Sequence, residues 1–332
     1  MALARDAEVA EYLRTHLLPG RSGPSRVALL GYQHGIALWR ADYPDSSVVF
    51  KHFHRNAATL ARHEVAGLRL ADTLGFAPAL LRVDETLPEL GEMAVIYEYP
   101  DGAPLLTGIT DEQINAWVFL LLTLQHLPLS PDTPVSPSCA DAPGWWERTR
   151  LLWRECRGRY ASSPFEALIS NLGQIEPIVG VRMEVNRHLW LSATRRPCHG
   201  QATPSHVFAG SKRTVFVDWE RFGLGDPAME AVVAAVPSTL EGTLDQRQYD
   251  LFLDSYAWGM RDLGDEDLSQ RIGILASVMP FAVVVESLLA GIPREPAARL
   301  ALARKLRRAL EWLGGSLGVA IDPLDDLLAP LM

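Results

Sequence analysis

The sequence predicts an α+β fold with two lobes: a small, sheet-rich N-terminal lobe over residues 1–100 and a large, mainly helical C-terminal lobe over residues 101–332. A chain of 332 residues is long enough to bury a hydrophobic core in each of two lobes. Short runs of β-branched and apolar residues, separated by turn signals, are concentrated in residues 26–99. Beyond them, apolar residues recur mainly at helical spacing, so we expect helices to dominate the second lobe.

The N-terminal lobe is predicted to begin with a charged amphipathic helix over residues 1–16, which does not have the composition of a signal peptide. The elements expected after it are strands at 26–30, 35–39 and 47–51, a helix over 56–74 that ends at Gly75, and strands near 79–83 and 93–99. Gly31 and Gly35 bracket the first connection, which we interpret as a tight turn. A loop signal at residues 100–104 marks the boundary between the lobes.

The C-terminal lobe is predicted to be a set of helices interrupted by one pair of strands. The helices are expected at 111–127, 145–159, 179–194, 246–261, 268–290 and 296–313, and the strands at 206–208 and 214–217. Residues 272–292 are apolar and long enough to cross a membrane. They contain Pro280 and Glu286, and a carboxylate is costly in lipid, so we expect a buried helix of the lobe and no membrane segment.

The overall composition excludes some classes of partner. The net charge of −9 gives no general attraction to nucleic acid or to an anionic membrane surface. The three cysteines (Cys139, Cys156 and Cys198) are odd in number and not closely spaced, which favours a reducing compartment over a disulfide framework. We therefore predict a cytoplasmic protein with neither a nucleic-acid nor a membrane partner.

One segment of the second lobe has the layout of a phosphoryl-transfer catalytic loop, a motif usually written H-G-D-x-x-P-x-N. His199, Gly200 and Pro204 keep the offsets of that motif. Gln201 stands where the catalytic Asp belongs, and His206 stands where the metal-binding Asn belongs. The loop could therefore keep the fold of such enzymes while its chemistry is altered.

A second motif follows this loop. Asp218 comes directly after the apolar strand residues 215–217, so its carboxylate is expected to project from the strand end. A hard oxygen ligand in that position suits Mg²⁺. Glu220 and Asp226 lie nearby and could add negative charge; alternatively, Asp226 caps the helix that starts at Pro227.

Candidate nucleotide contacts lie in the first lobe. Lys51 ends an apolar strand, as expected of a lysine that reaches phosphates from a sheet, although a solvated lysine would also fit there. Glu64 lies in the following helix, where its carboxylate could hold Lys51 by an ion pair. The turn between Gly31 and Gly35 could cover phosphates, or it is a plain hairpin connection, because it lacks the G-x-G-x-x-G pattern.

Glu98 and Tyr99 belong to the segment 97–102, which is expected to cross between the lobes. Exposed backbone groups at such a crossing are suited to the edge of an adenine base. A loop without a ligand is the alternative, and the residue types do not separate the two.

Taken together, these motifs resemble the aminoglycoside phosphotransferase family, a branch of the protein-kinase-like fold shared with choline, homoserine and fructosamine kinases. The matching segments are residues 49–51, 62–64, 96–105, 124–126, 199–206, 217–220 and 225–227. The resemblance implies ATP or GTP with Mg²⁺, and transfer of the γ-phosphoryl group to a hydroxyl of a small molecule. It also implies that Lys51 touches the phosphates, Glu64 orients Lys51, Asp218 binds metal, and His199 braces the catalytic loop.

The two departures from the family motif affect catalysis directly. Gln201 cannot act as a base, although its amide oxygen can accept a hydrogen bond. Loss of general-base assistance costs roughly 10²–10⁴-fold in rate, which raises the barrier by about 3–5 kcal/mol. The imidazole of His206 prefers softer ions such as Zn²⁺ or Mn²⁺ to Mg²⁺. It could also serve as a substitute base, or simply hydrogen-bond its neighbours in the loop.

Two functions fit this pattern. The first is an active phosphotransferase with a remodelled loop, acting on a small-molecule alcohol or a peptide Ser/Thr. The second is a pseudokinase, a ligand-binding or scaffold subunit with a protein partner, for example in a natural-product or peptide-modification pathway. Transfer of a nucleotidyl group ranks last. We favour the phosphotransferase because Lys51, Glu64 and Asp218 are retained, and we expect Lys51 and Asp218 to converge on one crevice between the lobes.

Overall fold

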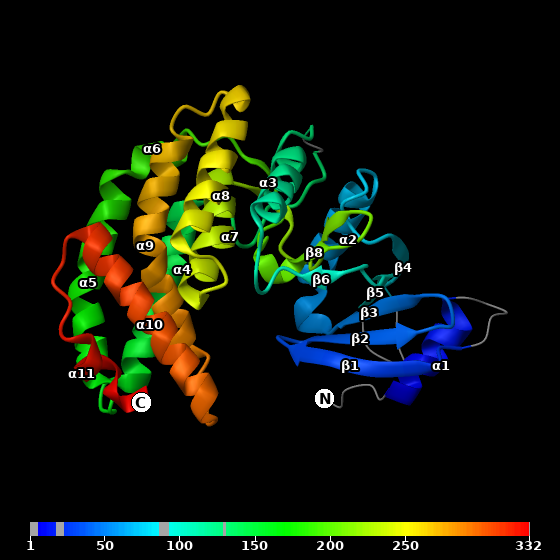
Figure 1. The fold of residues 1–332 in the computed structure, drawn as a ribbon, viewed down its shortest axis with the longest axis horizontal. Helices are drawn as coiled ribbons and strands as arrows, with labels where there is room; N and C mark the ends of the chain where they lie inside the picture. The colour runs from blue at the N-terminus through cyan, green and yellow to red at the C-terminus, as the bar shows by residue number, and fades with distance from the viewer. Residues whose placement is uncertain (1–5, 18–22, 86–92, 129–130, 332) are drawn as a thin grey trace. The chain divides into compact units, whose positions relative to one another are not determined.

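A computed structural model describes the chain except for residues 1–5, 18–22, 86–92, 129–130 and 332 (Figure 1). The chain divides into two compact units. The first unit comprises Met1–Leu105, Ser130–Pro137 and Ser205–Gly223, and the second comprises Leu106–Leu129, Ser138–Pro204 and Leu224–Met332. The first unit holds an antiparallel sheet and the second is mainly helical, which confirms the predicted α+β fold class.

The first unit is built on a five-stranded antiparallel sheet. Its strands, in spatial order, are β1 (Arg26–Gln33), β2 (Ile36–Asp42), β3 (Ser47–Phe53), β5 (Met93–Glu98) and β4 (Leu80–Asp84). Helix α1 (Asp6–His16) contributes Val9, Tyr12 and Leu13 to a core that includes Trp39 and Phe50 of the sheet. Side chains alternate between the faces of a strand, so Lys51, next to Phe50 on β3, points to the opposite face. That face is met by α2 (Ala58–Asp72), which follows the short 3₁₀ helix Arg55–Ala57.

The first hairpin has a shorter connection than the predicted one, which spanned residues 31–35. Strand β1 continues to Gln33 through a bulge between Leu29 and Gly31. The turn consists of His34 and Gly35 alone, with φ of 52° and 78°. Two left-handed residues in succession match the twist of the flanking strands, so a two-residue turn suffices and Gly31 belongs to the strand.

Residues 205–223 pack with the first unit, whereas the domain prediction assigned them to residues 101–332. They form β8 (Val207–Ala209) and β9 (Thr214–Phe216), which pair with each other and, through β8, with β6 (Ala103–Pro104). The N–H of Phe216 donates to the carbonyl oxygen of Phe76 at 2.9 Å. Gly102 is required beside this sheet, because a Cβ there would lie 2.0 Å from the carbonyl oxygen of Ala209.

The second unit is a helical assembly. Its helices are α3 (Asp111–Gln125), α4 (Ala142–Tyr160), α5 (Glu166–Val185), α6 (Arg187–Leu191), α7 (Pro227–Glu241), α8 (Gln246–Gly259), α9 (Leu268–Leu289), α10 (Pro296–Leu317) and α11 (Leu324–Leu328). The single helix predicted over 179–194 is wrong: α5 begins at Glu166 and accommodates Pro177 in its interior, and α6 is separate. Proline usually ends a helix, so the sequence around Pro177 does not indicate that a helix begins before it.

Helix α9 is the apolar segment considered as a membrane span. By length and composition it could cross a membrane, but 78% of its most apolar window is buried. It packs against α7, α10 and α4 of the same unit (Figure 1). Such burial is typical of the core helix of a soluble protein.

Candidate active site

The predicted lysine is the centre of a charged cluster in the first unit. Lys51 lies on β3 between Leu38 of β2 and Val95 of β5, and it is only 4% exposed. Its ammonium nitrogen lies 3.0 Å from Oε2 of Glu64 and 3.2 Å from Oε2 of Glu220. The ammonium also donates to Oδ1 of Asp218. An ammonium has three N–H donors, so all three have a carboxylate within reach.

Helix α2 fixes Glu64 and is itself fixed to the segment that carries Asp218. Glu64 is fully buried. On the next turn of α2, Gly67 lies against Trp219, and a Cβ at position 67 would be 2.7 Å from Cε3 of that indole. His63 Nδ1 lies 2.6 Å from the carbonyl oxygen of Phe222. The helix and the segment 217–222 are therefore locked together at two points.

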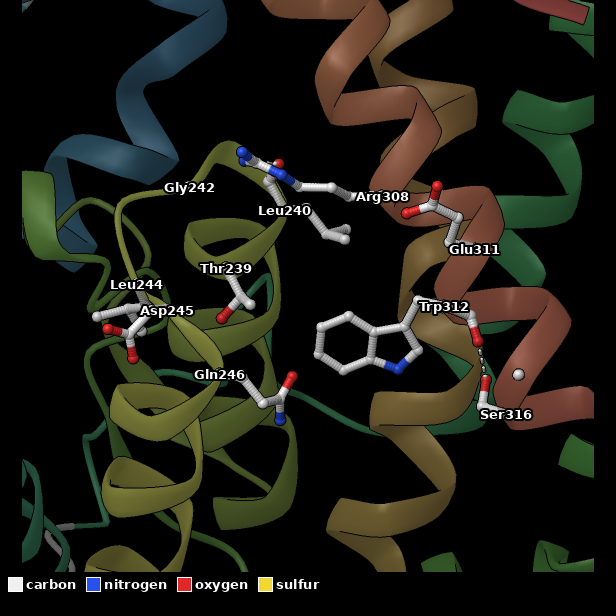
Figure 2. A pocket seen from close by; sticks show the side chains of 11 residues that line it. Thr239, Leu240, Gly242, Leu244, Asp245, Gln246, Arg308, Glu311, Trp312 and Ser316 are labelled. Carbon is white, nitrogen blue, oxygen red and sulfur yellow. Dashed lines mark hydrogen bonds between the residues drawn. The ribbon is translucent and has the colours of Figure 1, made fainter. Parts of the chain in front are cut away.

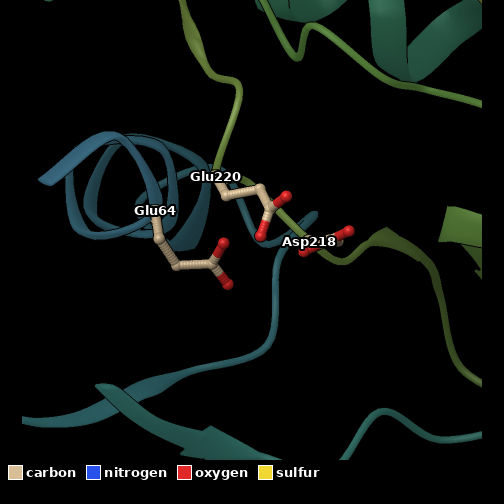
Figure 3. Close-up of side chains that lie close together, drawn as sticks. All are labelled: Glu64, Asp218 and Glu220. Carbon is tan, nitrogen blue, oxygen red and sulfur yellow. The ribbon is translucent and has the colours of Figure 1, made fainter. Parts of the chain in front are cut away.

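In the segment Asp218-Trp219-Glu220, both carboxylates reach Lys51, and the tryptophan between them is buried. Trp219 is fully buried, and its indole N–H donates to the carbonyl oxygen of Phe216 at 3.1 Å. Asp218 has a left-handed φ of 66°, which is strained for a residue with a side chain. Figure 3 shows the resulting arrangement, in which Glu64, Asp218 and Glu220 face one another. Strain of this kind is concentrated at functional sites.

The electrostatics of the cluster follow from its burial. Burial by itself would lower the pKa of Lys51, but the carboxylates of Asp218 and Glu64 raise that pKa well above its ordinary value. Burial raises the pKa of Glu64, and the neighbouring Lys51 opposes that rise. Lys51 is therefore a permanent cation, and burial leaves the pKa of its partner Glu64 raised to about 7. Asp218 and Glu220 remain as additional negative charge in the same place.

The donor set fits a divalent cation. One carboxylate oxygen from each of Glu64, Asp218 and Glu220 can be chosen so that all lie within 4.8 Å of one another. The side chains of Asp218 and Glu220 are 26% and 14% exposed, whereas that of Glu64 is 0% exposed and is paired with Lys51. Asp218 and Glu220 are thus the accessible oxygen donors, which suit Mg²⁺ or Mn²⁺. His206 lies beside them, with Nε2 at 3.4 Å from Oδ2 of Asp218.

Glu220 is the member of this cluster that sequence reasoning treated only as extra charge. The signal that could have identified it is the alternation of acid, tryptophan and acid directly after an apolar strand. Strand alternation does not explain why the two acids meet, because the strand ends at Phe216 and Asp218 has a left-handed φ of 66°.

The predicted catalytic loop lies mostly in the second unit. Gly200 has a φ of 85°, and its N–H donates to Oε2 of Glu230 at 2.9 Å. His199 is fully buried, and its Nδ1 accepts from the N–H of Gln201 at 3.3 Å. Burial raises the pKa of Glu230 to about 7, against the effect of the Gly200 N–H. The sequence reasoning missed Glu230, although an acid in the first turn of α7 could have been noticed.

The predicted nucleotide-covering and adenine-edge residues have local structural roles. Gly35 has a φ of 78°, a backbone conformation that residues with side chains rarely adopt, so the turn favours glycine there. The N–H of Glu98 donates to the carbonyl oxygen of Ala79 at 3.0 Å. The N–H of Tyr99 donates to the carbonyl oxygen of Ser47 at 2.9 Å. Adenine could use these two donors only if they left their present partners.

Asp226 is a capping residue, as the structural alternative predicted. Its side chain accepts from the N–H of Ala228 at 2.9 Å at the start of α7, with Pro227 in the first helical position. Asp226 also pairs with the buried guanidinium of Arg271, which bonds Asp265 as well. Asp226 therefore stabilises the second unit.

Two pockets lie in the described part of the second unit. One, of about 690 Å³, lies between α7, α8 and α10, with Trp312 projecting into it (Figure 2). The other, of about 520 Å³, is lined by α4 and α5, including Trp146. Neither cavity is lined by a predicted site residue.

Comparison with known proteins identifies the family. Residues 6–265 match the model described as the phosphotransferase enzyme family, which covers well over half of the chain. The chain belongs to the phosphotransferase enzyme family. This membership confirms the resemblance that the motifs indicated. No curated protein sequence matches the chain significantly.

Solved structures of phosphotransferases share the fold. Choline kinase LicA from Streptococcus pneumoniae is 16% identical, with a TM-score of 0.61 over 93% of this chain and 99% of that chain. The ADP-bound aminoglycoside phosphotransferase APH(2'')-Ib is 12% identical, with a TM-score of 0.60 over 94% and 99%. The GDP complex of wild-type aminoglycoside 2'-phosphotransferase-IIIa is 14% identical, with a TM-score of 0.56 over 95% and 99%. These likenesses confirm the predicted kinase-like fold class.

Proposed function

We propose that the protein is a phosphotransferase that uses ATP or GTP with Mg²⁺ or Mn²⁺ to phosphorylate a hydroxyl of a small molecule. The observation that carries this proposal is the convergence of Lys51, Glu64, Asp218 and Glu220 on one point. Family membership supports a phosphotransferase, and the similar structures bound to ADP and GDP support a nucleotide ligand.

The charge of the cluster defines the order of events that we expect. Phosphates would meet three carboxylates beside a single ammonium, so nucleotide alone should bind poorly. Asp218 and Glu220 would hold the metal, with the imidazole of His206 beside Asp218. Bound there, the metal supplies neutralisation of the charge that develops on the phosphates. Lys51 would exchange two of its carboxylate contacts for phosphate oxygens while Glu64 keeps its ammonium in place.

The acceptor side of the proposal rests on the loop. The amide oxygen of Gln201 would accept a hydrogen bond from the acceptor hydroxyl without removing its proton. His199 would keep that loop in shape through its contact with the Gln201 N–H. The acceptor would be a small-molecule alcohol or a Ser/Thr side chain of a peptide, and turnover would be slow because no carboxylate base is present at position 201.

A pseudokinase is the second candidate, and one observation favours it. The three donors of Lys51 and the N–H groups of Glu98 and Tyr99 already have partners within the protein. A scaffold or ligand-binding subunit that engages a partner protein, for example in a natural-product or peptide-modification pathway, would not need to release them.

Thermal stabilisation by nucleotide separates the two candidates. We expect ATP or GTP with Mg²⁺ to raise the melting temperature, and either nucleotide with EDTA to leave it nearly unchanged. Ligand at 100 times its Kd stabilises a protein by about 2.7 kcal/mol, which is readily measured. Asp218→Asn should abolish the shift, whereas Asp45→Asn, at an exposed turn of the same unit, should not.

Product formation is then measured as ADP or GDP release with aminosugars, choline and a serine-containing peptide as acceptors. Metal-dependent stabilisation followed by acceptor-dependent release supports the phosphotransferase. The absence of any nucleotide-dependent shift would favour the scaffold.

A further inference from the structure

Two histidines lie on the face of the main sheet opposite Lys51. His52 is the residue after Lys51 on β3, and alternation along the strand points its side chain to the other face. His54 follows the end of the same strand and has the same orientation by spacing. His52 is 1% exposed and His54 is 7% exposed. Their ring centroids are 4.8 Å apart, with 64° between the ring planes.

Three of the four imidazole nitrogens of this pair lack a hydrogen-bond partner within the described part of the chain. Over the described part of the chain, neither Nδ1 nor Nε2 of His52 has a partner, and nor does Nδ1 of His54. Two aromatic rings border the pair: the ring centroid of Trp39 lies 6.5 Å from that of His52, and the ring centroid of Tyr32 lies 6.0 Å from that of His54. Leaving a buried polar group unpaired costs roughly 1–3 kcal/mol, so a group of three such atoms in one place requires an explanation.

The two buried imidazoles offer nitrogen donors to an ion. Neutral imidazole is the form that binds metals, and it suits Zn²⁺, Ni²⁺ and Cu²⁺ better than Mg²⁺. The pair therefore differs in chemistry from the oxygen donors around Lys51.

We propose that His52 and His54 form a binding site for a soft divalent transition metal, with Zn²⁺ as the representative ion. With metal–nitrogen bonds of about 2.0–2.1 Å, two imidazoles at angles of roughly 90–110° place their ring centroids about 4.5–5.2 Å apart. The observed 4.8 Å falls within that interval. Two histidines leave the other coordination positions of a tetrahedral ion to water.

The test measures metal binding by the untagged full-length protein, with ZnCl₂ in calorimetry and CoCl₂ in visible absorption. The protein should bind one equivalent of Zn²⁺, and its melting temperature should rise on addition of the ion. His54→Phe keeps an aromatic ring without nitrogen donors and should weaken binding by more than about tenfold, as expected for loss of a ligand. His52→Phe should do the same. His188→Ala, at an exposed histidine of α6, should bind as the wild type does.

A further variant separates this site from the one proposed for nucleotide. Asp218→Asn should still bind one equivalent of Zn²⁺ at His52 and His54. The test of this metal site is therefore independent of whether the protein transfers phosphoryl groups. The proposal is overturned if His54→Phe binds Zn²⁺ within twofold of wild type, or if the only bound equivalent disappears in Asp218→Asn. No binding at millimolar Zn²⁺ would also overturn it, and would leave an edge-to-face contact between the rings as the explanation of the unpaired nitrogens. Should His52→Phe fail to fold, His54→Phe and the cobalt spectrum still decide the matter.

Discussion

Gly67 offers the sharpest test of how the site is held together. The substitution Gly67→Ala places a Cβ 2.7 Å from Cε3 and 2.8 Å from Cβ of Trp219, and 2.9 Å from Cβ of Phe222. Two of these atoms are attached directly to the backbone, so relief requires movement of the segment 217–222. Overpacking of this kind lowers the free energy of unfolding by roughly 1–3 kcal/mol. Because the two Cβ atoms cannot move without the backbone, we expect a loss near the upper end of that range. Alanine regains about 1 kcal/mol of helix propensity, which leaves a net loss of about 2 kcal/mol.

A matched control isolates the packing effect. Gly273 lies in α9 with no atom within 4 Å of its would-be Cβ, so Gly273→Ala should stabilise the protein by up to about 1 kcal/mol. Urea denaturation followed by circular dichroism measures both variants. Because Asp218 and Glu220 move with Trp219, Gly67→Ala should also reduce the stabilisation by nucleotide with Mg²⁺. A Gly67→Ala protein as stable as the Gly273→Ala protein would refute the proposed lock between α2 and the acidic segment.

Three other predictions address the charges of the two units. Lys51→Met should abolish the stabilisation by nucleotide with Mg²⁺. It should also lower the free energy of unfolding by about 3–5 kcal/mol, because Glu64 loses its buried ion-pair partner. A variant with the melting temperature of the wild type, both without ligand and with nucleotide and Mg²⁺, would contradict this. Glu230 has a pKa raised from 4.5 to about 7 in the folded protein, so its contribution is most favourable below pH 4.5 and falls by up to about 3 kcal/mol as pH rises through 7. Glu230→Gln should flatten that part of the stability–pH curve, and an unaltered slope would show that another group is responsible. Gln201→Asp should raise phosphoryl transfer by roughly 10²–10⁴-fold while Gln201→Ala does not, as measured by nucleoside diphosphate release; equal rates in the two variants would exclude a base at this position.

The sequence by itself determined the features that depend on neighbouring residues. Strand alternation around Lys51, the helix that carries Glu64, and the cap by Asp226 before Pro227 all follow from rules that act over a few residues. The motifs at 199–206 and 217–220 were enough to indicate the family, which the match to residues 6–265 confirmed. The roles of the site residues stay predictions.

Only the tertiary structure decided how distant segments meet. Asp218 is 167 residues from Lys51, and no local rule states that Glu220 joins it or that Trp219 needs a glycine at position 67. The support of Gly200 by Glu230 is likewise a contact between separate elements. Such contacts depend on which side chains fill the space between packed elements, and that space exists only once the chain has folded.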